Sequence, residues 1–433
     1  MTHAHRFLCK NGVVSPAADI PPVAAFLEAQ PGAYTTTRTH SNVSQVLFWE
    51  RHLSRISNSF KLLLREKPNL LLQNPINDST RFWKLSTRSA MWESVIRSLV
   101  HDSMKKVMPL ALEGRNLGEE LAITVLLSGN GRNLDLCGGT FDEGRISEVL
   151  DVYLHVGGYI PTAFGSRESA NRLAVVGRGR DFANAKYADW VRFMILLQLD
   201  LLDLEFLTFG SRDHLAVVRR VFLNRLRKSL ERLRPPSVTE LLLSNDGERI
   251  LEGCLTNFFV ISLKEKDEDV SHAEQSELQS WSGIEVQTAP LTDGVLPGVV
   301  RQVIRDICLS NGIPFREVSP SWSKRDLWLE VFVTSKSVIM SAALLCCSSL
   351  DVKLASVQVE FVLVGFRLDG LRIIQPVETI QAPCAWESVE SSSWKDIQWV
   401  EKRFQNGPGM ITSMLQKEIL EKASVESYPV ALF

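Results

Sequence analysis

The chain has 433 residues, of which 45% are hydrophobic and 23% are charged, and its formal net charge is -2. These proportions are typical of a globular protein, and the length suggests at least two domains of ordinary size. A net charge so close to zero gives no electrostatic reason to expect nucleic acid or an anionic membrane surface as a partner.

The seven cysteines are scattered, and none forms a CxxC pair or a Cys/His cluster with the spacing of a metal site. The sequence therefore predicts no metal and favours free thiols in a reducing compartment. Residues 1–14 predict a strand and a turn, and they lack the apolar run of a signal peptide. The most apolar stretch, 193–209, contains three acidic residues and is too short to span a membrane. We therefore expect a cytoplasmic protein that is not bound to a membrane.

The first part of the chain alternates between helical and extended patterns. Apolar spacing predicts a helix over residues 45–64 and a long helical region that continues to about residue 108. Strands are predicted over 121–127 and 152–156, followed by a Gly- and Pro-containing connection over 157–166. We place a domain boundary there, which gives a smaller N-terminal α/β domain of residues 1–160 and a larger C-terminal domain of residues 161–433.

Beyond this boundary, strands at 173–176 and 240–243 lead into the turn Asn-Asp-Gly at 245–247. An apolar strand within 250–261 completes a hairpin. A strand over 285–289 precedes a helix over 299–311, which a Pro-Gly pair opens, and another strand covers 329–334. An amphipathic helix over 411–423 closes the chain. The whole pattern predicts an α+β protein.

Four short segments carry residue types suited to chemistry, although each is weak alone. Residues 252–259 (EGCLTNFF) place a glutamate in an apolar stretch. Taken alone, this glutamate is as consistent with an ordinary surface residue as with a functional one. Residues 294–301 deliver a helix N-terminus, which suits an anion such as phosphate. Residues 50–55 (ERHLSR) put charge on a helix, which usually means only a solvated face. Lys186, within 184–190 (NAKYADW), follows a strand-like segment and would alone be taken for a surface lysine.

Together and in this order, these segments resemble the class IV aminotransferases, a family that includes branched-chain aminotransferases, D-amino-acid aminotransferases and aminodeoxychorismate lyases. The resemblance runs from about residue 32 to residue 334, and residues 32–38 (GAYTTTR) resemble the first strand of the family's site. It implies the two-domain class IV fold, pyridoxal 5′-phosphate held by the C-terminal domain, and a homodimer. The final segment is similar to one in plant members described as branched-chain-aminotransferase-like.

The resemblance also assigns roles to single residues. It implies Lys186 as the lysine that carries the cofactor, and Glu252, with Asn257 in the same motif, as the partner of the pyridine nitrogen. It implies Arg55 and the backbone amides of Val299 and Val300 as phosphate ligands, with Thr334 and Ser335 in a further loop near the phosphate. It implies Tyr34 and Thr36 as substrate contacts. Val300 stands where the family often has threonine, so a backbone contact is kept and a hydroxyl contact is lost.

Two stretches depart from the family, residues 193–226 and 336–370. Lys186 and Glu252 lie 66 residues apart, about twice the family spacing. Removing 193–226 restores the spacing and a single amphipathic helix, and removing 336–370 restores a continuous loop. Lys228, an alternative to Lys186, fits the spacing less well. We predict two insertions, either retained introns or genuine lineage-specific helices, and sequencing the transcript distinguishes the two.

The predicted function is the transfer of an amino group between a small amino acid, branched-chain or D-configured, and a 2-oxo acid. The three consecutive threonines at 35–37 resemble the lyase and D-amino-acid branches more than the branched-chain enzymes. Aminodeoxychorismate lyase activity is therefore the alternative within the family. A fold-retaining protein with impaired activity is the alternative from another class, and the insertions favour it.

Overall fold

In the computed structural model, the described residues are 6–15, 20–72, 89–130, 143–161, 163–165, 170–188, 233–264, 281, 283–335, 340–341, 367–368, 373–390, 393–405 and 407–433. The predicted insertion 193–226 and the alternative Lys228 lie outside these residues. Of the predicted insertion 336–370, only the short strands β14 (Met340–Ser341) and β15 (Arg367–Leu368) are described, and they pair with each other.

The first sheet is built mainly from the amino-terminal part of the chain and has the order β18-β4-β3-β5-β6-β1-β2. Because side chains alternate along a strand, Ile123, Val125 and Leu154 lie on one face of the sheet, in an apolar core shared with helices α2 and α4. Helix α1 packs on the opposite face, where Phe26 contacts Tyr153. The elements are β1 (Arg6–Lys10), β2 (Val13–Val14), α1 (Val23–Ala29), β3 (Ala33–His40), β4 (Gln45–Val46), α2 (Trp49–Glu66), η2 (Pro68–Leu71), α4 (Ser89–Glu113), β5 (Glu120–Gly129), α6 (Glu143–Val149), β6 (Leu150–Tyr159) and β18 (Tyr428–Pro429).

The second sheet has the order β12-β11-β10-β13-β16-β7-β8-β9, and β17 pairs with β16. Strand β9 also pairs with β10, so this sheet closes on itself. Phe258 and Val333 point into its interior, whereas Phe259 and Phe332 stack on each other under helix α9. The elements are β7 (Asn171–Val175), β8 (Glu240–Ser244), β9 (Ile250–Gly253), β10 (Thr256–Leu263), β11 (Ile284–Thr288), η5 (Leu291–Asp293), α9 (Val299–Ser310), β12 (Phe315–Glu317), η6 (Trp322–Leu327), β13 (Trp328–Ser335), β16 (Ile374–Pro383), η8 (Trp386–Glu390), η9 (Trp394–Asp396) and β17 (Trp399–Arg403).

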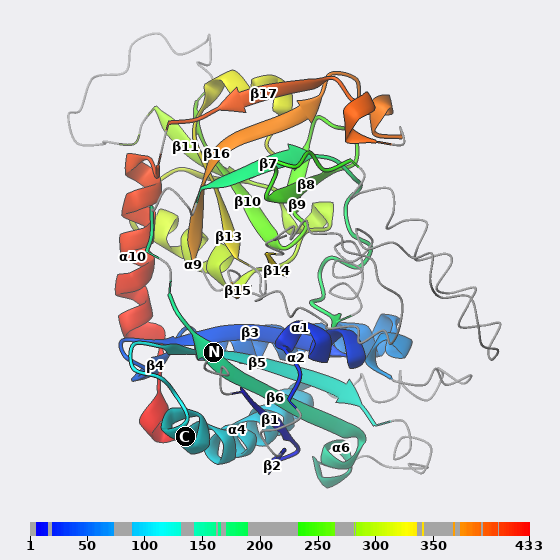
Figure 1. Ribbon diagram of the computed structural model, residues 1–433, viewed down its shortest axis with the longest axis vertical. Coiled ribbons are helices and arrows are strands. Elements are labelled where there is room, and N and C mark those ends of the chain that lie inside the picture. Colours follow the sequence, from blue (N-terminus) through cyan, green and yellow to red (C-terminus); the bar gives the residue numbers. More distant parts are fainter. Residues whose placement is uncertain are drawn as a thin grey trace, which may run out of the picture.

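The carboxyl-terminal tail connects the two sheets. Helix α10 (Met410–Glu426) packs against α9, and its first turn is capped by Glu330, whose carboxylate accepts hydrogen bonds from the N–H groups of Ile411 and Thr412 at 3.0 and 2.8 Å. Strand β18 then pairs with β4 in the first sheet, and η10 (Val430–Leu432) ends the chain. Figure 1 shows α10 in red beside both sheets, so the tail fixes their relative position.

The structure confirms the predicted α+β architecture and most predicted elements, and it corrects two. The helix expected from residue 45 begins at Trp49, because residues 45–46 pair in β4 and Phe48 has a φ of 46°, which is incompatible with a helix. The stretch 250–261 contains two strands, β9 and β10, which a bend at Cys254 and Leu255 separates. Part of the long helical region, residues 73–88, lies outside the described residues.

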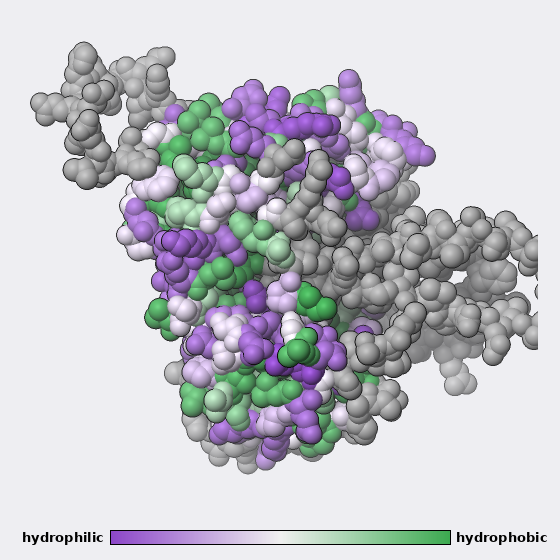
Figure 2. Space-filling view, turned by 60° about the vertical axis from the view of Figure 1, so that its left-hand side comes forward, coloured by the Kyte–Doolittle hydropathy of each residue, from purple (hydrophilic) through white to green (hydrophobic). Residues whose placement is uncertain are grey.

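The surface in Figure 2 mixes hydrophilic and hydrophobic residues among its coloured atoms. Of the helices that the structure describes, none is long and apolar enough to cross a membrane.

Candidate active site

Lys186 lies at the edge of the first sheet. It follows a turn closed by the hydrogen bond from Ala185 N to Phe182 O, so the predicted strand-like setting is wrong. Its carbonyl accepts the N–H of Tyr34 at 3.0 Å, and its own N–H donates to Ser59 Oγ at 3.1 Å. The side chain is only 3% exposed, and its Nζ lies 4.8 Å from the centre of the Tyr34 ring. A buried lysine is rare, so this position is a candidate for chemistry.

Arg55 belongs to a polar stripe on the buried face of α2. His52, Arg55 and Ser59 are spaced i, i+3 and i+7, so they share this face. Arg55 Nη2 donates to Thr35 Oγ1 at 2.5 Å and lies 3.2 Å from His52 Nδ1. Burial lowers the pKa of Arg55 to about 10, although Tyr34 raises it, so the guanidinium stays charged at neutral pH. The stripe thus places a buried cation beside the helix face that anchors Lys186.

Glu252 is the last residue but one of strand β9 and is fully buried in the second sheet. One carboxylate oxygen accepts from Arg180, with Nε at 2.7 Å and Nη2 at 2.6 Å, and the other accepts the N–H of Leu296 at 2.9 Å. A buried carboxylate held by a guanidinium and a backbone donor is stabilised in its ionised form. Arg180 was not among the predicted site residues.

Three of the predicted residues form a row across the second sheet. Asn257 is the cross-strand partner of both Glu252 and Thr334, so the three side chains share one face. Asn257 Nδ2 donates to Leu296 O at 2.9 Å. Thr334 is 1% exposed, and its Oγ1 has no hydrogen-bond partner among the described residues. Ser335 is placed beside Thr256 by backbone pairing.

The amino terminus of α9 adjoins this row. Gly298 is the N-cap residue, and no side chain caps the helix. The N–H groups of Val299 and Val300 lie in the first turn, where a helix offers them no acceptor. A Cβ at Gly298 would lie only 2.2 Å from Asn257 Oδ1, so glycine is required for the helix to approach the row this closely. The arrangement combines open amides with a positive helix end.

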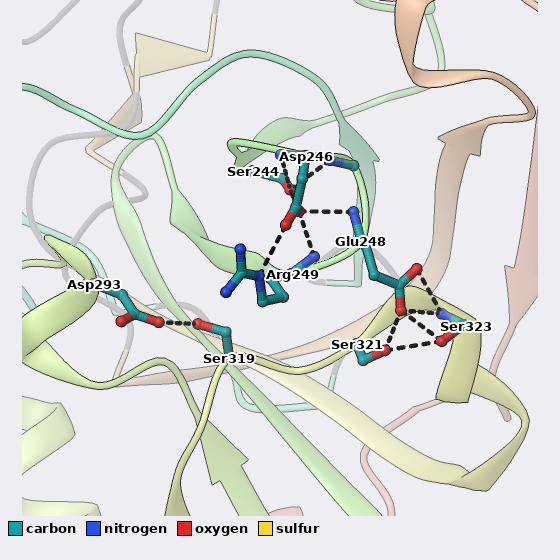
Figure 3. Close-up of polar contacts among 9 residues, drawn as sticks. Ser244, Asp246, Glu248, Arg249, Asp293, Ser319, Ser321 and Ser323 are labelled. Carbon is teal, nitrogen blue, oxygen red and sulfur yellow. Dashed lines mark hydrogen bonds and ion pairs between the residues drawn. The ribbon is translucent and has the colours of Figure 1, made fainter.

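A polar network outside the row holds the turn that precedes β9 and the loop that precedes α9. In the β8–β9 turn, Asp246 accepts the N–H groups of Glu248 and Arg249 at 3.0 and 2.8 Å (Figure 3). The Glu248 carboxylate in turn binds Ser323, in the segment that follows β12. Ser319, in the same segment, donates to Asp293 at 2.7 Å, in the loop before α9. This segment therefore ties the turn that precedes Glu252 to the loop that precedes Val299.

The predicted residues fall into two groups. One group lies on the first sheet and α2, and contains Tyr34, Thr36, Arg55 and Lys186; the other lies on the second sheet and α9, and contains Glu252, Asn257, Val299, Val300, Thr334 and Ser335. The segment from Arg180 to Lys186 reaches both groups, and α2 is joined to α9 by an ion pair of 2.9 Å between Arg51 and Asp306. Thr36, two residues after Tyr34 and on the same face of β3, bonds Thr124 Oγ1 at 3.0 Å.

Sequence reasoning missed Arg180, Thr35 and His52. Arg180 lies six residues before Lys186, after a buried strand, and that position was the available signal. Thr35 belongs to the threonine run and His52 to the motif at 50–55, so both were inside patterns already noted. Nothing in the sequence links either residue to Arg55 except the helical spacing of His52.

No family model matches the chain, and no curated protein matches it. Among solved structures, a T.th. branched-chain amino acid aminotransferase, complexed with N-(5′-phosphopyridoxyl)-L-glutamate, is 12% identical, with 99% of this chain and 100% of that chain covered and a TM-score of 0.50. A branched-chain aminotransferase of Thermoproteus uzoniensis with norvaline is 15% identical, with 99% of each chain covered and a TM-score of 0.48. At such identities the likeness is one of fold, and the chain has the fold of the class IV aminotransferases, as predicted.

Proposed function

We propose that this protein is a pyridoxal-phosphate-dependent aminotransferase of class IV, with Lys186 as the lysine that carries the cofactor. The observation that carries the proposal is the buried Lys186 amine, 4.8 Å from the Tyr34 ring, on a chain segment that also reaches Glu252 through Arg180. The fold supports the same assignment.

The residues present fit a bound phosphate. Arg55 Nε and Thr334 Oγ1 are buried and have no hydrogen-bond partner among the described residues. A buried polar atom without a partner costs about 1–3 kcal/mol, so such atoms point to a ligand that satisfies them. The first-turn amides of Val299 and Val300 add backbone donors and a helix dipole. We propose that these four residues hold the phosphate.

Each remaining group has a distinct task. When bound, pyridoxal phosphate supplies an aldehyde that captures an amino group and a ring that accepts electrons from the substrate Cα. Glu252, kept ionised by Arg180, would orient the ring by pairing with its nitrogen, and Asn257 fixes the adjacent loop through Leu296. Lys186 Nζ would take the proton from the substrate Cα and deliver it to the carbon C4′ of the cofactor. Tyr34 would contact the substrate carboxylate.

We propose a small amino acid, branched-chain or D-configured, and a 2-oxo acid as substrates. The buried hydroxyls of Thr36 and Thr124 bond each other on the same face of the first sheet as Tyr34, and this pair favours aminodeoxychorismate lyase activity as the second candidate. We also propose a cytoplasmic homodimer with residues 161–433 as the cofactor-binding domain and 1–160 as the smaller domain.

The proposal is tested by adding pyridoxal phosphate to the purified protein and recording absorption near about 420 nm. Lys186→Ala should abolish the band, and the control Lys228→Ala should keep it. Protein that stays colourless and takes up no cofactor would instead support a fold-retaining binding protein. Product analysis with D-alanine, branched-chain amino acids and aminodeoxychorismate then separates transaminase from lyase.

A further inference from the structure

Three buried polar side chains meet where strand β3 packs against helix α2. Thr35 on β3 is fully buried, and His52 and Arg55 on α2 are 7% and 6% exposed. Thr35 Oγ1 lies 2.8 Å from His52 Nδ1 and 2.5 Å from Arg55 Nη2, and the distance from Nη2 to Nδ1 is 3.2 Å. The three atoms form a closed triangle of hydrogen-bonding contacts.

The chemistry of these groups fixes the direction of each bond. Arginine can only donate, so Thr35 Oγ1 accepts from Nη2 and its own hydrogen is available for His52. His52 Nδ1 therefore accepts from both neighbours, which requires a neutral ring with its hydrogen on Nε2. Burial, together with the charges of Arg55 and Lys186, holds the pKa of His52 well below its usual range, in agreement with a neutral ring.

The triangle determines which donors of Arg55 remain for a ligand. With Nη2 held by Thr35 and His52, the plane of the guanidinium is fixed, and its Nε is the buried donor without a partner among the described residues. We propose that His52 is a positioning residue that acts with Thr35 to aim Arg55 at the cofactor phosphate. This inference rests on the proposed function, since it assumes that Arg55 binds that phosphate.

The affinity of the protein for pyridoxamine 5′-phosphate, divided by its affinity for pyridoxamine, isolates the contribution of the phosphate. Both are measured by quenching of tryptophan fluorescence. We expect His52→Leu to reduce the ratio about tenfold, because the orientation of a charged donor is lost. His52→Asn, whose side-chain oxygen can replace Nδ1 as an acceptor, should restore most of the ratio. Thr35→Val should resemble His52→Leu, and the control His40→Asn should leave the ratio unchanged.

Different results would contradict the proposed function and the proposed role of His52. If the wild-type protein binds both compounds equally, the proposed function fails, and the role of His52 in phosphate binding fails with it. If the wild type prefers the phosphorylated compound but His52→Leu keeps that preference, the role of His52 alone is overturned. Equal losses in His52→Leu and His52→Asn would also overturn it, because a merely structural histidine predicts no rescue.

A second measurement does not depend on cofactor binding. Nitrogen NMR of protein with isotope-labelled histidine, at neutral pH, should show His52 with an unprotonated Nδ1 and a protonated Nε2. A proton on Nδ1, or a charged ring, would contradict the triangle. This measurement uses the wild-type protein, so its outcome does not depend on whether the His52→Leu variant folds.

Discussion

The buried ion pair between Arg180 and Glu252 allows the sharpest test of how the site is stabilised. Their side chains are 3% and 1% exposed, and Arg180 Nη2 lies 2.6 Å from Glu252 Oε1. Arg180→Met removes the guanidinium and leaves the buried Glu252 carboxylate without its cationic partner. Breaking a buried pair in this way costs about 3–5 kcal/mol, because the remaining charge keeps its desolvation penalty.

The assay is urea unfolding followed by tryptophan fluorescence, with the free energy obtained by linear extrapolation. The double variant Arg180→Met/Glu252→Gln should recover much of the loss, since a neutral amide replaces the unpaired charge. Arg249→Met is the matched control, because Arg249 is 69% exposed in its pair with Asp246, and such pairs contribute at most about 1 kcal/mol. An Arg180→Met variant within about 1 kcal/mol of wild type would refute the reasoning.

Three further predictions follow from local geometry. Gly298→Ala would place a Cβ 2.2 Å from Asn257 Oδ1. We therefore expect the free energy of unfolding in urea to fall by about 1–3 kcal/mol and phosphate binding to weaken. Unchanged values for both would contradict the close approach of α9 to Asn257. Burial raises the pKa of Cys308 to about 12, so a maleimide at neutral pH should label the exposed Cys384 and spare Cys308, as mass spectrometry can show; equal labelling would be inconsistent with the packing of α9. Burial lowers the pKa of His155 to about 4, so the unfolded chain binds a proton at a higher pH than the folded protein does. The free energy of unfolding should therefore fall by up to about 3 kcal/mol as the pH drops from about 6.5 to about 4. His155→Gln should lose less stability over this range, and an identical loss would show that His155 does not contribute.

The sequence was most informative where a motif is local and its geometry is set by regular structure. Glu252 and Asn257 lie on neighbouring strands joined by a short bend, so one motif places both on the same face of the second sheet. The Pro-Gly pair before α9 likewise predicted an open helix N-terminus, and the helix begins at Val299 as expected. These features depend on chain neighbours and so can be read from sequence.

Long-range partners could not be predicted in the same way. The bond from Arg180 to Glu252 spans 72 residues, and no periodicity links the two positions. Thr35 meets Arg55 only because helix α2 packs against strand β3 of the first sheet. The pairing of β18 with β4 brings together residues from opposite ends of the chain, which an amphipathic tail helix does not indicate. In each case packing, rather than local propensity, selects the partner.

The central claim is that Lys186 carries the cofactor. Its most direct test is to add pyridoxal phosphate to the full-length protein, reduce the complex with borohydride, digest it and locate the pyridoxyl group by mass spectrometry. The account predicts a single modified peptide that contains Lys186, and no such peptide from Lys186→Ala. Modification at Lys228 or at another lysine, with Lys186 unmodified, would contradict it.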